Sequence, residues 1–291
     1  MSYLKSYKTL RFATELTLGT PDSSFEELPS YLYMIRRANL GTVAGLQIDE
    51  SGRFNYMFIA FGASIAGFHY MRRVVVVDGT FLHGSYKGTL LTALAQDGNF
   101  QIVPLAFGVV DTENDDSWRW FFTQLKVVIP DATDLAIISD KHKSIEKAIG
   151  ELYPLAARGI CTYHLYKNIL VKFKGKDLFP LVKKAARCYR LNDFTNAFNE
   201  IEERDPLLHA YLQRAGVEMW ARPHFPGDRY NLITTNIAES MNRALSQAKN
   251  LPIVRLLEAI RHMMTRWFAE QRDDASKQHT QLTRGVEKLL Q

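Results

Sequence analysis

The sequence predicts an α/β protein with a mixed β-sheet of element order βββαβαβ, a helical insertion and a late helix. Three apolar runs come in series, at residues 73–78, 88–96 and 100–110. Asp97-Gly98-Asn99 joins the last two as a tight hairpin. Helix and strand patterns then alternate to residue 163, and residues 165–230 are helical and basic. This order is typical of a mixed sheet with helices packed on it.

The segment before these strands predicts a helix and a hairpin. Ser-x-x-Glu pairs begin the helix at residues 23–40, and Asn39-Leu40-Gly41 ends it, so Pro29 must lie in or near the first turn. Two apolar runs joined by Asp49-Glu50-Ser51-Gly52 form the hairpin. A short helix is expected at 64–71.

After the three strands, the pattern predicts the remaining elements in turn. They are a helix at 115–129 with an acidic start, a strand at 134–140, a helix at 143–153, a strand at 158–163, a Pro/Gly-rich loop at 222–234, and helices at 234–250 and 253–270. We divide the chain into a lead-in (1–70), a core (71–165), a basic helical insertion (166–230), C-terminal core helices (231–270) and a polar tail (271–291) expected to fray.

Composition indicates a globular protein in a reducing compartment. The 291 residues are 46% apolar and 23% charged. Two cysteines, Cys161 and Cys188, are too few for a disulfide framework. The first residues lack the apolar region of a secretory signal, and no apolar run approaches the ~20 residues of a membrane span. No membrane partner is therefore expected.

Positive charge is concentrated in residues 141–190. This stretch holds twelve Lys/Arg and three Asp/Glu, a net +9, so the other residues sum to −4 of the overall +5. The segregation favours a surface that meets a polyanion, with a solvated helical face as the alternative. Two clusters are candidate DNA contacts: Lys172, Lys174 and Lys176, then Lys183, Lys184 and Arg187.

Two aspartates come directly after buried strands. Asp78 follows four valines, and Asp140 follows Ile137-Ile138-Ser139. If these strands are parallel neighbours, both carboxylates meet at one edge of the sheet. Paired carboxylates repel each other, and a divalent cation with oxygen ligands removes that repulsion. Helix capping or a turn is the alternative role for each aspartate.

Glu239 is the candidate third carboxylate. Its helix carries an apolar stripe that includes Ile237 and Met241, and Asn236, Glu239 and Arg243 lie on another stripe that could face the edge. Three carboxylates can hold two metals about 3.5–4 Å apart, as phosphoryl transfer requires. A solvated glutamate is the alternative.

Several motifs together resemble the transposases of plant Mutator-like elements. They are VVVVDGTFLHGSYKGTLLTALAQDGNFQIVPLAFGVVDTENDDSWRWFF, DLAIISDKHKSIEKAI, GICTYHLYKNI and TTNIAESMN, within residues 25–265. The resemblance implies an RNase H-like fold with a helical insertion before the last acidic residue. It also implies a DDE triad of Asp78, Asp140 and Glu239 that binds Mg²⁺ or Mn²⁺. A nuclear location, transposon-end and target DNA as partners, and a homo-oligomer are further expectations.

The same family shows a Cys-x-x-His motif, here Cys161 to His164. Structural zinc needs about four ligands, so we expect none. A structural role near the edge is favoured, with His164 touching a phosphate or a backbone group. Nearby acids, Asp111, Glu113, Asp115 and Asp116, are explained more simply by helix capping and the helix dipole than by a metal cluster.

Three functions remain open at this stage. The first is a DDE transposase core. The second is a domesticated relative, like the far-red response regulators, that binds DNA or protein in the nucleus without catalysis. A simple RNase H-like nuclease acting on RNA is the third, and the long basic insertion argues against it. The family's complete transposases carry DNA-binding and zinc-finger modules outside this core, so little preference for element ends is expected.

Overall fold

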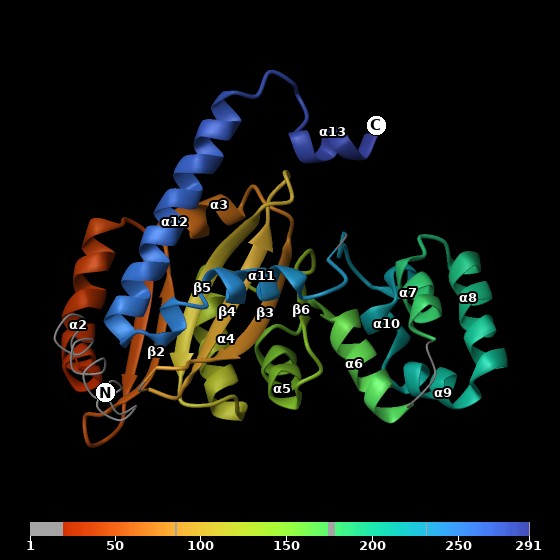
Figure 1. The fold of residues 1–291 in the computed structure, drawn as a ribbon, viewed down its shortest axis with the longest axis horizontal. Helices are drawn as coiled ribbons and strands as arrows, with labels where there is room; N and C mark the ends of the chain where they lie inside the picture. Colours follow the sequence, from red (N-terminus) through yellow and green to blue (C-terminus); the bar gives the residue numbers. More distant parts are fainter. Residues whose placement is uncertain (1–19, 85, 174–177, 231, 291) are drawn as a thin grey trace, which may run out of the picture.

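A seven-stranded mixed sheet forms the centre of the protein (Figure 1). The computed structural model describes residues 20–84, 86–173, 178–230 and 232–290. The strands are β1 (Val43–Ile48), β2 (Phe54–Ala60), β3 (Val74–Phe81), β4 (Thr89–Gln96), β5 (Ile102–Val110), β6 (Ala136–Ser139) and β7 (Ala157–Ile160). They lie side by side in the order β1-β2-β5-β4-β3-β6-β7. Strands β3, β6 and β7 are parallel, and the other neighbours are antiparallel. The predicted βββαβαβ order is confirmed, and it is consistent with an RNase H-like fold.

Both faces of the sheet are covered by helices. Val75 and Val77 pack in one core with aromatic residues of α4 (Asp115–Val128), beside α3 (Gly62–Phe68) and α5 (Lys143–Leu152). Val74 and Val76 pack on the other face with α2 (Pro21–Ala38), α11 (Asn236–Ala244) and α12 (Ile253–Ser276). Because successive side chains of a strand point to opposite faces, the four valines serve both cores.

The basic insertion is a helical unit beyond the β7 edge of the sheet (Figure 1). Its elements are α6 (Thr162–Lys172), α7 (Phe179–Arg187), α8 (Leu191–Arg204), α9 (Pro206–Arg214), α10 (Val217–Trp220) and a short η1 (Arg222–His224). It has a core of its own, in which Phe194 and Phe198 pack around the fully buried Trp220.

Two predicted element boundaries are wrong: the start of α2 and the junction between β7 and α6. Thr20, and not a serine of the Ser-x-x-Glu pairs, caps α2 in a capping box with Ser23, so Pro29 lies inside the helix. Pro29 is exposed, so the backbone bond it cannot donate is lost on the solvent side. Strand β7 ends at Ile160, and Cys161 caps α6 because Thr162 bonds to Ile233 instead of continuing the sheet.

The C-terminal part also differs from the prediction. The single helix expected at 234–250 ends at Ala244 and is followed by a short η2 (Ala248–Asn250). Helix α12 continues to Ser276, and the expected frayed tail contains α13 (Arg284–Leu290). Thr283 and Gly285 bond to the β4–β5 turn at Gly98 and Asn99, which holds this tail against the sheet end. No described helix has the length and apolar character needed to cross a membrane.

Candidate active site

Asp78 and Asp140 lie where the parallel pairing of β3 with β6 ends. Asp140 directly follows β6, whereas Asp78 lies within β3, which continues to Phe81 instead of ending at residue 78 as predicted. Val76 pairs with Ile138 in the β3–β6 ladder, and the same register two residues further places Asp78 level with Asp140. Neighbouring strands are about 4.8 Å apart. The predicted parallel adjacency of these strands is therefore confirmed. Asp78 lies two residues after Val76 on the same strand, so its side chain points to the same face of the sheet, which α11 covers.

The carboxyl of Asp78 is mostly buried, and its pKa is raised to about 7. Burial is the main cause, and the negative charges of Asp140 and Glu113 add to it. The positive field of His164 and a hydrogen bond from Asn242 oppose the shift. Asn242 Nδ2 donates to Asp78 Oδ2 at 3.1 Å. Negative charge at this edge is thus only partly compensated by the protein itself.

Helix α11 presents Asn242, and not Glu239, to Asp78. Asn236, Glu239 and Arg243, the stripe expected to face the edge, are all exposed. In the part of the chain that the structure describes, no hydrogen bond or ion pair joins Glu239 to either aspartate, and no three His, Cys, Asp or Glu side chains converge on one point as a ready metal site. The role of Glu239 stays a prediction.

The groups at the edge nevertheless suit a hard divalent cation. Asp78 and Asp140 offer carboxylate oxygens, which Mg²⁺ prefers. Asn242 Oδ1 is a buried acceptor with no hydrogen-bond partner among the described residues. An unpaired buried oxygen beside a partly protonated carboxyl is unfavourable without a cation and becomes satisfied when one binds.

The Cys-x-x-His motif joins β7, α6 and the segment before α11. Thr235 donates its backbone N–H to Cys161 Sγ at 3.1 Å, and its Oγ1 lies 3.5 Å from His164 Nδ1. Burial raises the pKa of the Cys161 thiol, but hydrogen bonds with His164 and Thr235 outweigh burial and lower it. The bond to Cys161, followed by the charges of Asp140 and Asp78, raises the pKa of His164. The motif therefore ties α6 to the residue before α11 and places the His164 side chain near the aspartates.

Glu113, which the sequence suggested for helix capping or the helix dipole, lies near the strand edge and not in the cap of α4. The cap of α4 is Asn114, which bonds to Ser117. Asp115 pairs with Lys147 at 2.6 Å, and Asp116 is exposed. Glu113 instead lies against Gly79, and its charge acts on Asp78 and Asp140. The one signal in the sequence that could have found it is the glycine directly after Asp78.

The comparisons with known proteins agree with this geometry. The family model of the MULE transposase domain matches residues 74–168, which hold β3 to β7, both aspartates and the Cys161–His164 pair. Over residues 74–168 the chain is thus similar to MULE transposase domains.

More distant relatives are found among curated proteins. The transposase for insertion sequence element IS905 of Lactococcus lactis is 23% identical over 60% of this chain and 47% of its own length. The transposase for IS256 in Tn4001 of Staphylococcus aureus is 23% identical over 54% of this chain and 42% of its own length. Protein FAR1-RELATED SEQUENCE 6 of Arabidopsis thaliana is 21% identical over 48% of this chain and 20% of its own length. The chain spans less than half the length of these relatives. Because they come from bacteria and a plant, they support the domain type without assigning a plant origin.

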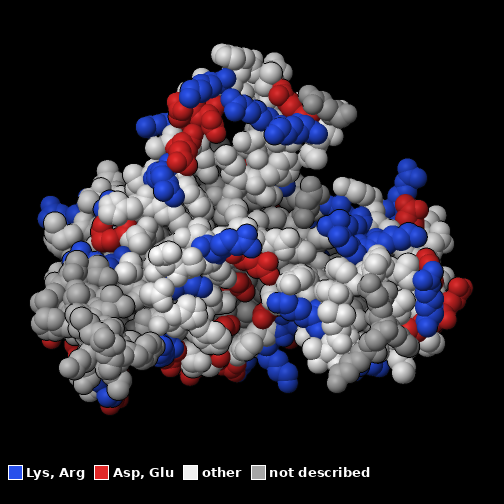
Figure 2. Space-filling model, in the orientation of Figure 1, with Lys and Arg blue, Asp and Glu red and all other residues white. Residues whose placement is uncertain are grey.

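The basic residues that follow the matched segment are placed unevenly. Lys183 and Arg187 are exposed on α7, whereas Lys184 lies 3.7 Å from Glu200 and Lys172 lies over the ring of Tyr211. Lys174 and Lys176 lie outside the described residues. Figure 2 shows Lys and Arg gathered where the helical insertion meets the sheet, next to acidic atoms near the middle of this face.

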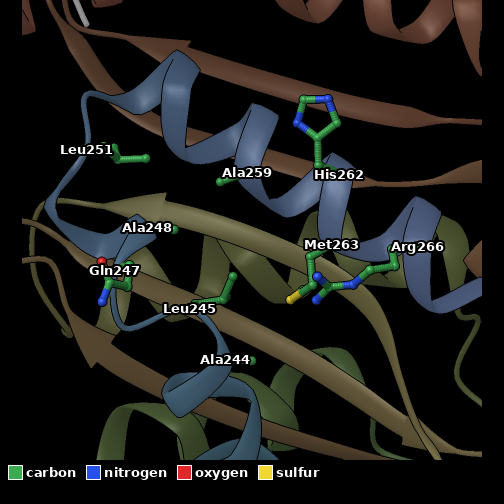
Figure 3. Close-up of a pocket in the computed structure, with 9 residues that line it drawn as sticks. All are labelled: Ala244, Leu245, Gln247, Ala248, Leu251, Ala259, His262, Met263 and Arg266. Atoms are coloured by element: carbon green, nitrogen blue, oxygen red, sulfur yellow. The ribbon is translucent and has the colours of Figure 1, made fainter.

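A separate groove of about 700 Å³ lies between the α11–η2 segment and α12 (Figure 3). Its lining is mostly apolar, with His262 and Arg266 from α12. It contains none of the predicted site residues. The candidate active site is therefore the strand edge and not this groove.

Proposed function

We propose that this chain is the catalytic core of a DDE transposase, which cleaves and joins DNA strands by metal-dependent phosphoryl transfer. The observation that carries the proposal is the level placement of Asp78 and Asp140 on parallel neighbouring strands inside the segment that matches the MULE transposase domain. Its partners are the ends of a mobile element and the target DNA. Because electrostatic contacts to phosphates do not depend on sequence, the exposed basic residues of α7 would hold DNA beside the edge.

In this proposal each side chain at the strand edge has its own role. Asp78 and Asp140 hold Mg²⁺ or Mn²⁺ through carboxylate oxygens, and Asn242 Oδ1 offers a neutral oxygen. Such a cation, when bound, stabilises the charge on the attacking and leaving oxygens of an in-line displacement. His164 lies beside Thr235 and near Asp78, where its raised pKa favours the protonated form. Glu239 stays our candidate third acid, one turn before Asn242 on α11.

A binding module without catalysis is the second candidate function. The likeness to Protein FAR1-RELATED SEQUENCE 6 and the exposed position of Glu239 favour it. In a eukaryotic host either function would place the protein in the nucleus, which imaging of a tagged chain tests.

Cleavage of supercoiled plasmid DNA separates the two functions. We expect nicking that requires Mg²⁺ or Mn²⁺ and falls at least about a hundredfold in Asp78→Asn and in Asp140→Asn, since loss of outer-shell groups alone costs 10–100-fold at metal sites. Asp111→Asn, an exposed aspartate at the end of β5, is the matched control and should cleave normally. Equal nicking by all three variants would contradict the site assignment. Metal-independent DNA binding with no cleavage by the wild type would favour the binding module.

A further inference from the structure

Lys249 is a buried lysine that reaches the same face of β3 as Asp78. It lies in η2 and keeps only 7% of its surface exposed. Its Nζ donates a hydrogen bond to Thr80 Oγ1 at 3.0 Å. Thr80 lies two residues after Asp78, and side chains two apart on a strand point to the same face. Because two residues of a strand span about 7 Å, the ammonium group lies just beyond the aspartate on that face.

The backbone holds Lys249 in this position. Its carbonyl accepts hydrogen bonds from the N–H of His83 at 3.0 Å and of Gly84 at 3.3 Å, in the segment between β3 and β4. Glycine is required at position 84, because a Cβ there would fall 2.8 Å from the backbone oxygen of Asn250. These contacts dock η2 on the segment that follows β3, so the lysine is held in place before any ligand binds.

Among the described residues, no acidic side chain forms an ion pair with Lys249. Asp78 takes its hydrogen bond from Asn242 instead, and its negative charge acts on Lys249 only at longer range. A buried cation without a direct counter-ion is unfavourable. An anion that binds beside Lys249 from solution would remove this cost.

Lys249 and Thr80 together offer hydrogen-bond donors that suit a phosphate. The ammonium group has three donors and uses one on Thr80, whose hydroxyl can still donate its own hydrogen. In the part of the chain that the structure describes, neither group has another hydrogen bond. Lysines and hydroxyls commonly bind the phosphates of DNA. Consecutive phosphates of one strand are about 3.4 Å apart along the axis, so this pair is within reach of a phosphate one or two positions from the one at Asp78.

We propose that Lys249 and Thr80 form a binding site for a backbone phosphate of the DNA strand, close to the phosphate that reacts at the strand edge. This inference rests on the proposed function, because it places the substrate strand along β3 from Asp78 to Thr80. The site differs from the contacts expected on α7, since Lys249 is buried and held by the backbone whereas Lys183 and Arg187 are exposed.

Equilibrium binding of a fluorescently labelled DNA duplex in EDTA tests the inference with the whole chain and without catalysis. Lys249→Met removes the charge and keeps an unbranched side chain. We expect it to weaken binding about tenfold or more, because hydrogen bonds to charged groups are the strong ones. The slope of log K against log salt should become shallower by about 0.9, the value for one phosphate contact. Lys126→Gln removes an exposed charge from α4, on the other face of the sheet, and is the matched control that should bind as the wild type does.

Thr80 supplies a second pair of variants that keep the charge of Lys249. Thr80→Val has nearly the same shape but no hydroxyl, so it should weaken binding about threefold with an unchanged salt slope, whereas Thr80→Ser should bind normally. Circular dichroism establishes the folding of each variant. If Lys249→Met does not fold, the Thr80 pair decides, and equal affinity of Thr80→Val and Thr80→Ser then overturns the inference.

The outcomes separate this inference from the proposed function. Unchanged affinity and slope in a folded Lys249→Met protein, together with metal-dependent nicking that requires Asp78, overturn the phosphate site and leave the proposed function standing. An equal loss of affinity in Lys126→Gln also overturns the site, because it would show a general effect of charge. DNA binding that depends on Lys249 in a protein that does not nick DNA contradicts the catalytic function and supports the phosphate site.

Discussion

Replacing Asp78 by asparagine should stabilise the metal-free protein at neutral and alkaline pH. The pKa of Asp78 is about 7 in the folded protein, against an ordinary value of 3.8. This shift of about 3 units corresponds to about 4 kcal/mol, because each unit is worth 1.36 kcal/mol. Asparagine has nearly the same shape and keeps an acceptor for Asn242, but it carries no charge to desolvate.

The sign follows from proton binding. Since the folded state holds a proton that the unfolded state releases between about pH 4 and pH 7, ionisation of Asp78 lowers stability as pH rises through this window. Below about pH 4 Asp78 is neutral in both states, and wild type and Asp78→Asn should be nearly equal in stability. At pH 8 the variant should be more stable by about 2–4 kcal/mol, the lower value allowing for relaxation around the charge.

Urea unfolding in EDTA at pH 4 and pH 8 measures this difference, with Asp111→Asn as the exposed control. Added Mg²⁺ should then stabilise the wild type and leave Asp78→Asn unchanged, because a ligand stabilises only a state that binds it. An Asp78→Asn protein that is less stable than the wild type at pH 8, or a difference that does not change with pH, would refute the reasoning.

Two further predictions concern the motif and the insertion. Cys161→Ala should lower the free energy of unfolding by about 1–3 kcal/mol, because the buried N–H of Thr235 loses its acceptor, and a zinc-selective chelator should have no effect on either protein; stoichiometric zinc that is lost with this variant would overturn our view of the motif. The binding constant for duplex DNA should fall as salt is added. If about six phosphates are contacted, a plot of its logarithm against the logarithm of the salt concentration should have a slope near −5. Lys183→Ala/Arg187→Ala should flatten the slope by about two units without sequence preference, whereas Lys184→Ala, whose charge pairs with Glu200, should change it less. An unchanged slope in the double variant would remove α7 from the DNA-binding surface.

The strand pattern predicted that the two aspartates follow the buried part of parallel neighbouring strands. A continuous apolar run such as residues 74–77 must be buried on both faces. The expected end of the strand at Asp78 was wrong, because β3 continues to Phe81 by pairing with β4, but Asp78 and Asp140 each lie two residues beyond the last pair of the β3–β6 ladder. The βββαβαβ order and the two-sided core followed from the same pattern.

Contacts between distant segments were harder to predict. Pairing of Glu113 with Gly79 depends on how α4 leaves the sheet, which no local pattern contains. Both Glu239 and Asn242 lie on α11, and the contact of Asn242 with Asp78 depends on how α11 is rotated over β3, which the helical stripe alone does not fix. Thr20 caps α2 because Pro21 is a favourable first helical residue, whereas the Ser-x-x-Glu spacing alone predicts a later start.

The central claim is that the strand edge holds a divalent cation between Asp78 and Asp140. A crystal grown with Mn²⁺ tests this claim most directly, because anomalous scattering locates manganese without reference to any mechanism. We predict an anomalous peak within about 2.5 Å of carboxylate oxygens of both aspartates. Its absence at saturating Mn²⁺, or a peak bound only by other residues, would contradict the account.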